Sequence, residues 1–177
     1  MNGLEIREKT FNKAKERMTM AHEGTKINRT VYILQGISGS GKSTTTKALM
    51  GRQEQHADEV VVSADKFWDI RGHYDFDVQF IKNSHEWCFA EFIKALRNNA
   101  NAIFVDNTNT SSWEYNRYID AAEKMGYKVY LVPVHGELSE EEILECYKRN
   151  VHEVPLEAIQ GQYNRLIKTW KPEQDIG

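Results

Sequence analysis

The sequence predicts an α/β fold in which a parallel sheet of about four strands carries helices on both faces. Short apolar strand patterns alternate with helical patterns along the chain, and residues able to do chemistry follow three of those strands. Such alternation produces a parallel sheet with right-handed crossovers. We expect the strand order 2-3-1-4, a main domain at residues 29–177 and an N-terminal helical arm at residues 1–28.

Composition limits the classes of protein to consider. The chain of 177 residues is long enough for one ordinary α/β domain and too short for two independent cores. Its net charge of −3 gives no general attraction for nucleic acid, so any polyanion site must be a local basic patch. No apolar leader or run of about 20 apolar residues is present, which predicts a cytoplasmic protein without a membrane partner.

Two cysteines, Cys88 and Cys146, lie within helical patterns and form no CxxC pair. This spacing favours neither a disulfide framework nor a zinc site. We expect both to be small buried residues of the core.

The four predicted strands are apolar, and each is short enough to be buried on both faces. They span residues 30–35, 60–63, 102–105 and 127–134. A glycine-rich segment follows the first, Asp65 follows the second and Asp106 follows the third. Ligands of parallel α/β sheets bind at the carboxyl ends of the strands, so these three features should meet at one edge.

Helices are predicted between the strands, and several carry start signals. They span residues 44–50, 77–98, 111–125, 139–150 and 155–170. Asp77 can cap the start of its helix. Ser111 with Glu114, and Ser139 with Glu142, have the spacing of a capping box.

A further helix is expected at residues 3–22, within the arm. Its narrow apolar stripe predicts packing on the core or on a partner subunit, which would make the protein an oligomer. The alternative is a basic handle for a polyanion, formed by Lys9, Lys13, Lys15 and Arg17. Interspersed glutamates dilute that charge and favour packing.

Residues 36–43 match G-x-x-x-x-G-K-[ST], the Walker A P-loop. Glycines let successive N–H groups converge on phosphate oxygens, and the following helix adds its positive end. Lys42 supplies a cation to the β- and γ-phosphates, and the Ser43 hydroxyl can bind Mg²⁺. The expected nucleotide-binding residues are Gly36, Ser38, Gly39, Ser40, Gly41, Lys42, Ser43 and Thr44.

The class of P-loop protein follows from what accompanies the loop. A GTPase needs an Asn-Lys-x-Asp segment after a late strand, and His135-Gly136-Glu137 stands there instead. A large motor or transporter ATPase needs a longer chain. These observations leave a compact kinase or a nucleotide-gated switch.

Phosphoryl transfer to a hydroxyl also needs a base or orienting group, a metal and cations over the phosphate. Asp65 can reach an acceptor hydroxyl, or it can cap a following helix. Asp106 can hold Mg²⁺ through water, or it can form an Asx turn. Arg149 can act as a lid cation on the nucleotide phosphates, with the lid at residues 139–155, or it can be a solvated charge at a helix end.

Other candidates concern the acceptor. His85 lies on the apolar face of its predicted helix, which favours a core histidine over a substrate contact. Trp87 can stack on a substrate or be a single exposed aromatic. Tyr74 and Phe76 can line an acceptor pocket or tie their loop down.

Several segments together resemble a known family. They are Gly36–Ser43, Ser63-Ala-Asp65, Tyr74-x-Phe76-Asp77, His85-x-Trp87, Val105-Asp-Asn-Thr-Asn109 with Trp113-Glu114, Gly126-Tyr127 and Arg149-Asn150-x-His152-x-Val154-Pro155. Over about residues 30–167 the chain resembles the P-loop domain of the NEDD4-binding-protein-2-like group, and it is similar to the 5′-kinase domain of phage polynucleotide kinases.

The resemblance implies transfer of the γ-phosphate of ATP to the 5′-hydroxyl of a polynucleotide. It implies that Lys42 and Ser43 bind phosphates and Mg²⁺, that Asp65 is the general base and that Arg149 is a lid arginine. The phage kinases carry an arginine for the acceptor phosphate where this chain has Trp68, and Arg71 can replace it if the segment is helical. They also carry a further basic lid residue where this chain has His152-Glu153.

Three functions therefore stay open. The leading one is a polynucleotide 5′-hydroxyl kinase, with Asp65, Arg71, Tyr74 and Trp87 at the substrate. The second is a small-molecule kinase for a sugar, nucleoside or antibiotic, with an aromatic acceptor pocket. The third is a non-catalytic module that binds ATP and presents the N-terminal helix to a partner.

Overall fold

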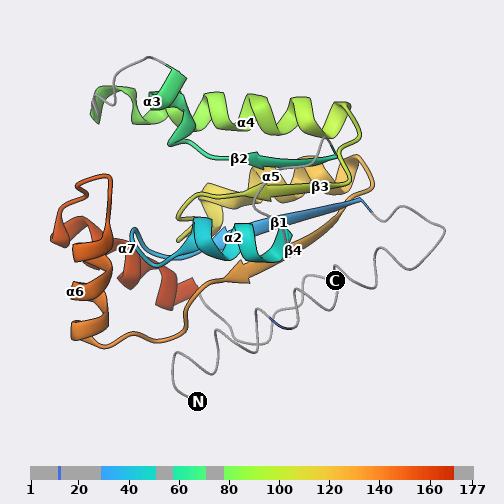
Figure 1. The fold of residues 1–177 in the computed structure, drawn as a ribbon. Helices are drawn as coiled ribbons and strands as arrows, with labels where there is room; N and C mark the ends of the chain where they lie inside the picture. The colour runs from blue at the N-terminus through green and yellow to red at the C-terminus, as the bar shows by residue number, and fades with distance from the viewer. Residues whose placement is uncertain (1–11, 13–28, 51–57, 71–77, 170–177) are drawn as a thin grey trace.

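The computed structural model describes residue 12 and residues 29–50, 58–70 and 78–169 (Figure 1). The strands are β1 (Thr30–Gln35), β2 (Glu59–Val62), β3 (Ala102–Val105) and β4 (Lys128–Pro133). The helices are α2 (Lys42–Met50), α3 (Lys66–Ile70), α4 (Ile81–Arg97), α5 (Ser112–Lys124), α6 (Glu140–Arg149) and α7 (Leu156–Thr169). The predicted arm at residues 1–28 lies outside the described residues, apart from residue 12.

The four strands form one parallel sheet in the order β2-β3-β1-β4, as the sequence predicts. Strand β1 lies between β3 and β4, with Ile33 opposite Val105 on one side and Leu131 on the other. All six residues of β1 are buried. Because β1 leads directly into the glycine-rich loop, that loop emerges from the centre of the sheet.

Helices cover both faces of the sheet (Figure 1). On one face, Val31 and Ile33 of β1 share a core with residues of α4 and α5, including Phe92 and Tyr118. On the opposite face, the alternate β1 residues pack with Leu49 of α2. The period-two alternation of β1 therefore supplies both cores, as expected for a strand buried on both sides.

A third apolar cluster joins the loop after β1 to the last two helices. Ile37 packs with Ile143 and Cys146 of α6 and with Ile159 of α7. This cluster places α6 and α7 beside the carboxyl end of β1, apart from the two faces of the sheet (Figure 1).

The two predicted capping boxes are confirmed. The Ser111 amide donates to Glu114 at 2.8 Å, and the Ser139 amide donates to Glu142 at the same distance. The ends of α5, α6 and α7 each lie one residue inside their predicted limits. Both cysteines are buried free thiols, as predicted.

Two helical starts differ from the prediction, and the first is α2, which begins at Lys42 rather than at Thr44. The long helix was expected from Asp77, but α4 begins at Ile81, after a 3₁₀ turn at Val78–Phe80. Such turns are common at helix N-termini, and no side-chain cap fixes this start. Asp77 itself lies outside the described residues. A helix at α3 was considered in two ways, as one that Asp65 caps and as the condition for Arg71 to replace the missing arginine.

Among the described helices, none has the length and apolar character that crossing a bilayer requires.

Candidate active site

The glycine-rich loop depends on backbone conformations that suit glycine. Gly39 and Gly41 have φ angles of 75° and 92°, which side chains rarely adopt. A Cβ on Gly39 would also lie 1.9 Å from the carbonyl oxygen of Cys146 in α6. The loop therefore needs glycine at position 39 both for its own shape and for its contact with α6.

Two distant side chains hold the first amides of this loop. The Ile37 amide donates to His135 Nε2 at 3.2 Å, and the His135 Nδ1–H faces the Gly136 carbonyl oxygen at 2.9 Å. The Ser38 amide donates to Gln162 of α7 at 2.8 Å. Sequence reasoning missed His135 and Gln162, because they follow the loop by 98 and 124 residues and belong to no recognisable spacing.

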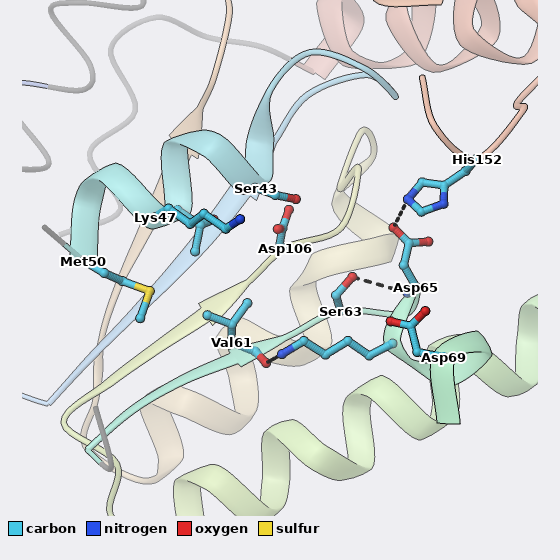
Figure 2. Close-up of a pocket in the computed structure, with 11 residues that line it drawn as sticks. Ser43, Lys47, Met50, Val61, Ser63, Asp65, Asp69, Asp106 and His152 are labelled. Atoms are coloured by element: carbon cyan, nitrogen blue, oxygen red, sulfur yellow. Dashed lines mark hydrogen bonds and ion pairs between the residues drawn. The ribbon is translucent and has the colours of Figure 1, made fainter. Parts of the chain in front are cut away.

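Lys42 and Ser43 begin helix α2 and face Asp106. The Lys42 ammonium donates to the Ile37 carbonyl oxygen at 2.9 Å, inside the loop itself. Burial lowers the pKa of Lys42, and the carboxylates of Asp106 and Asp65 oppose that shift. Burial raises the pKa of Asp106, and a hydrogen bond from Ser43 opposes it. Figure 2 shows the Ser43 hydroxyl and the Asp106 carboxylate directed at one another.

The residues after Asp106 tie the strand ends together. Asn107 accepts a hydrogen bond from the Ala64 amide at 2.8 Å, next to Asp65. Asn109 donates to the Leu34 carbonyl oxygen of β1 at 2.8 Å and has a positive φ of 46°. The asparagines therefore brace the ends of three strands, and the Asp106 side chain faces Ser43.

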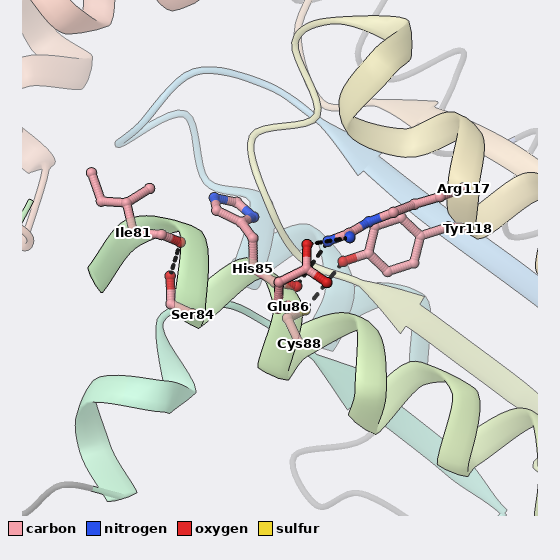
Figure 3. Close-up of polar contacts among 7 residues, drawn as sticks. All are labelled: Ile81, Ser84, His85, Glu86, Cys88, Arg117 and Tyr118. Carbon is pink, nitrogen blue, oxygen red and sulfur yellow. Dashed lines mark hydrogen bonds and ion pairs between the residues drawn. The ribbon is translucent and has the colours of Figure 1, made fainter. Parts of the chain in front are cut away.

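Asn107 is anchored to helices α4 and α5 through the thiol of Cys88. Asn107 donates to Cys88 Sγ of α4 at 3.4 Å, and the Tyr118 hydroxyl of α5 donates to the same sulfur at 3.5 Å. Arg117 binds Glu86 at 2.8 Å and the His85 carbonyl oxygen at 2.9 Å, which joins α5 to α4 (Figure 3). These contacts hold α4 and α5 together, and through Asn107 they connect both helices to the residue that follows Asp106.

Asp65 lies immediately before α3, at the position of a helix cap. Its carboxylate instead reaches His152, in the segment between α6 and α7, with Oδ2 3.2 Å from Nε2 (Figure 2). Within the described parts of the chain, no hydrogen bond joins the Asp65 carboxylate to an amide of α3. The Asp65 amide donates to Ser63 Oγ at 3.3 Å, which fixes the backbone below it.

A cavity of about 340 Å³ lies between α2, β2, α3 and the His152 segment (Figure 2). It is lined by Ser43, Thr46, Lys47, Met50, Val61, Ser63, Asp65, Lys66, Asp69, Asp106 and His152. Ser43 and Asp106 stand on one side and Asp65 on another. The three strand-end features predicted to converge are therefore brought to one cavity.

Helix α3 decides which side chains reach the cavity. Trp68 is only 3% exposed and makes an edge contact with Phe67, so it packs inward. Asp69 lines the cavity instead. Across from it, Lys47 extends into the cavity from α2 (Figure 2). The sequence reasoning missed Lys47, although its place four residues after Ser43 puts both on one helical face.

The remaining described candidates, Arg149, Trp87 and His85, do not line this cavity. Arg149 ends α6 and is exposed, with a guanidinium nitrogen 3.6 Å from Cys146 Sγ. Trp87 is partly buried against the core and contacts the Phe67 ring, so it does not line the cavity. His85 is half-buried, and burial lowers its pKa. Arg71, Tyr74 and Phe76 lie outside the described residues.

No group of three or more His, Cys, Asp or Glu side chains in the described ranges is arranged to hold a metal ion by itself. Ser43 and Asp106 nevertheless supply a hydroxyl and a carboxylate side by side, oxygen donors of the kind that Mg²⁺ prefers. A cation here would need phosphate oxygens and water to complete its shell.

Known proteins share this sequence pattern. A family model described as AAA domain matches residues 31–169. The chain is 32% identical over 133 residues to human NEDD4-binding protein 2, covering 75% of this chain and 7% of that protein. It is 30% identical over 151 residues to a protein of Autographa californica nuclear polyhedrosis virus named as a bifunctional polynucleotide kinase/RNA ligase, covering 80% and 21%. The chain thus spans a small part of both relatives.

Solved structures share the fold. A chain from the Pnkp1/Rnl/Hen1 RNA repair complex superposes with a TM-score of 0.63 at 24% identity, covering 84% of this chain and 47% of that one. A second structure of a Pnkp1/Rnl/Hen1 complex gives a TM-score of 0.53 at 23% identity, covering 70% and 40%. The match over residues 31–169 shows that the chain belongs to the AAA domain family, and its P-loop and parallel sheet agree with that assignment.

Proposed function

We propose that this domain transfers the γ-phosphate of ATP to the 5′-hydroxyl of a polynucleotide. The observation that carries the proposal is the cavity in which Asp65 stands apart from Ser43 and Asp106, with open space between them. The names of the viral relative and of the solved RNA repair complex support the choice of acceptor.

The phosphate side of the reaction would use the loop and α2. Backbone amides of the loop and the helix N-terminus would bind the phosphates, and Lys42 would exchange its bond to Ile37 for one to the nucleotide. Ser43 and Asp106 would hold Mg²⁺, which neutralises charge on the phosphates when bound. Arg149 ends α6, whose Cys146 carbonyl oxygen packs against Gly39, and would reach the same phosphates from the lid.

The acceptor side would use Asp65. A bond forms between the acceptor oxygen and the γ-phosphorus while the bond from that phosphorus to the bridging oxygen of ADP breaks. The hydroxyl proton moves to the Asp65 carboxylate, and ADP keeps the electron pair of the broken bond. Asp65 is the carboxylate that suits this role, because Asp106 is buried beside Ser43 whereas the Asp65 side chain is 56% exposed to the cavity and solvent.

The alternative acceptor is a small hydroxyl compound. One observation favours it: Trp68 packs inward, so α3 presents Asp69 to the cavity where an acceptor-phosphate cation is expected from the phage kinases. Lys47 and Lys66 supply the positive charge that remains in the cavity. A direct phosphoryl-transfer assay distinguishes these two classes of acceptor.

The test measures transfer of labelled γ-phosphate from ATP to 5′-hydroxyl oligonucleotides of RNA and DNA. Asp65→Asn should reduce turnover by about 10²-fold or more, as expected for loss of a general base. Asp120→Asn is the matched control, because it removes the same charge from an exposed position on α5 that does not line the cavity, and it should keep the turnover. No label on either oligonucleotide, from protein shown to bind ATP, would overturn the polynucleotide acceptor and leave the small hydroxyl compounds.

A further inference from the structure

The segment from α6 to α7 contacts the phosphate-binding loop at several points. A Cβ on Gly39 would lie 1.9 Å from the Cys146 carbonyl oxygen and 3.2 Å from the Asn150 amide nitrogen, and Gln162 accepts from the Ser38 amide. Ile37 is enclosed by apolar residues of both helices. The lid, residues 139–155, and the first half of α7 are therefore packed down on the loop.

The same lid also reaches across the cavity to Asp65. His152 Nε2 lies 3.2 Å from Asp65 Oδ2, and the His152 side chain is only about one-third exposed. The turn that carries His152 is fixed by its neighbour Asn150, which accepts from the His152 amide at 3.1 Å and donates to the Val154 carbonyl oxygen at 2.9 Å. The imidazole is thus presented by a braced turn rather than by a free loop end.

The charges around His152 favour this contact. The hydrogen bond to Asp65 raises the pKa of His152, Asp69 acts in the same direction, and burial and Lys42 oppose it. A protonated imidazole bound to a carboxylate is a charge-assisted hydrogen bond, which is stronger than a neutral one.

We infer that His152 is a positioning residue that latches the lid to Asp65, so that closing the lid over the phosphates and aligning the base are one event. The role of the base rests on the proposed function. One carboxylate oxygen is held by the imidazole, and the second remains to accept the hydroxyl proton. Such coupling delays alignment of the base until the lid covers the site, which limits transfer to water.

Two cysteines of the chain can report whether the contact between His152 and Asp65 keeps the lid closed. Cys146, on the side of α6 that packs against Ile37, is 3% exposed, whereas Cys88 of α4 is fully buried in the main core. Opening of the lid should expose Cys146 to iodoacetamide and leave Cys88 protected. Mass spectrometry of the two cysteine peptides follows both rates in one sample, without any substrate.

His152→Ala and Asp65→Asn should each speed alkylation of Cys146 several-fold, with Cys88 unchanged. The double variant should be no faster than the faster single variant, because both changes break one contact. Val151→Ala, an exposed neighbour in the same turn, should leave both rates unchanged. Unchanged protection of Cys146 in the two single variants, additive effects, or equal acceleration at both cysteines would overturn the latch.

The positioning role has a kinetic signature as well. His152→Ala should lower kcat about tenfold or more with little change in KM for ATP, because supporting contacts of this kind typically contribute 10–100-fold. His152→Gln can still donate to Asp65 and should restore part of the loss. If His152→Ala kept the wild-type kcat while Asp65→Asn lost most of its turnover, the positioning role would be overturned. If wild-type protein phosphorylates no oligonucleotide, the proposed function fails, whereas the Cys146 rates still decide the latch.

Discussion

The two sides of the cavity are built differently. On the phosphate side, the loop, Lys42 and Ser43 come from one continuous segment between β1 and α2. On the proposed acceptor side, the residues come from three separate segments: Lys47 from α2, His152 from the turn after α6, and Asp65 with Asp69 from α3 and the residue before it. The residues of the first are neighbours in the sequence, whereas those of the second meet only when distant segments pack together.

This difference between the two sides indicates which part of the cavity can change its specificity for the acceptor. The phosphate side needs a fixed backbone, since Gly39 has no room for a side chain against Cys146. On the acceptor side, Trp68 has turned into the core and Asp69 takes a place at the cavity. A single helical residue can therefore alter the acceptor wall without disturbing the phosphate cradle.

The largest effect is expected at Lys42. Lys42→Ala should reduce phosphoryl transfer by about 10²–10³-fold, because a cation on the transferring phosphate is lost. Thermal stability should not fall, because burial already disfavours the charged form of this side chain. Transfer kinetics and melting curves, measured together, check this separation of activity from stability. A melting temperature several degrees lower would contradict it.

Gly39→Ala should be the next most damaging change. It places a side chain where φ is positive and 1.9 Å from the Cys146 carbonyl oxygen, so the lid or the loop must shift. Gly126→Ala is the matched control, with a φ of 77° and no atom within 4 Å of its Cβ. Both variants share the backbone strain of about 1–2 kcal/mol, so the excess loss in Gly39→Ala reports the contact.

That excess should amount to about 1–3 kcal/mol in the free energy of unfolding, the range for overpacking in a tight site. Chemical denaturation of both variants measures it. Equal losses would show that the lid does not rest on Gly39.

A smaller effect is expected at Lys47, on the acceptor side. Lys47→Ala should raise KM for an oligonucleotide about 3–10-fold and leave KM for ATP nearly unchanged, because one cation facing the acceptor is removed. Lys124→Ala, at the far end of α5, is the control for loss of one positive charge. A larger change in KM for ATP than for the oligonucleotide would assign Lys47 to the phosphate side instead.

The smallest effect concerns pH. The pKa of His152 is raised above 6.5 in the folded protein, so its bond to Asp65 contributes stability that is full below pH 6.5. That contribution is lost as pH rises through the folded pKa. Because the His152 side chain is about one-third exposed, the contribution of this bond to the free energy of unfolding should stay below about 1 kcal/mol.

Melting curves of wild-type protein and His152→Phe, taken from pH 5.5 to 9, check this dependence. The difference in melting temperature between the two proteins should be largest at pH 5.5 and should approach zero at pH 9. A difference that grows with pH would mean that Asp65 does not hold the protonated imidazole.

Much of the fold could be predicted because its signals are local. β1 and β3 have the predicted bounds, since each is a short apolar run closed by a polar or glycine residue. The capping boxes at Ser111 and Ser139 marked two helix starts to within one residue. The start of α4 was wrong because no side chain caps it.

The site was predictable only where one segment contains it. The phosphate loop, and the convergence of Asp65 and Asp106, follow from strand ends in a parallel sheet. His135 and Gln162 could not be found in the same way, because each reaches the loop from a different element about 100 residues later. The inward packing of Trp68 was equally hidden, since either face of a five-residue helix can be buried.

The sequence by itself determined the parallel sheet, the glycine-dependent loop and the three strand ends that carry functional groups. Periodicity, capping and backbone freedom act over a few residues and can be read along the chain. The tertiary structure alone decided that His152 meets Asp65, that Cys146 closes on Gly39 and that Asp69 rather than Trp68 faces the cavity. Those contacts join elements far apart in the chain, and they form only when the lid and α3 pack against the completed sheet.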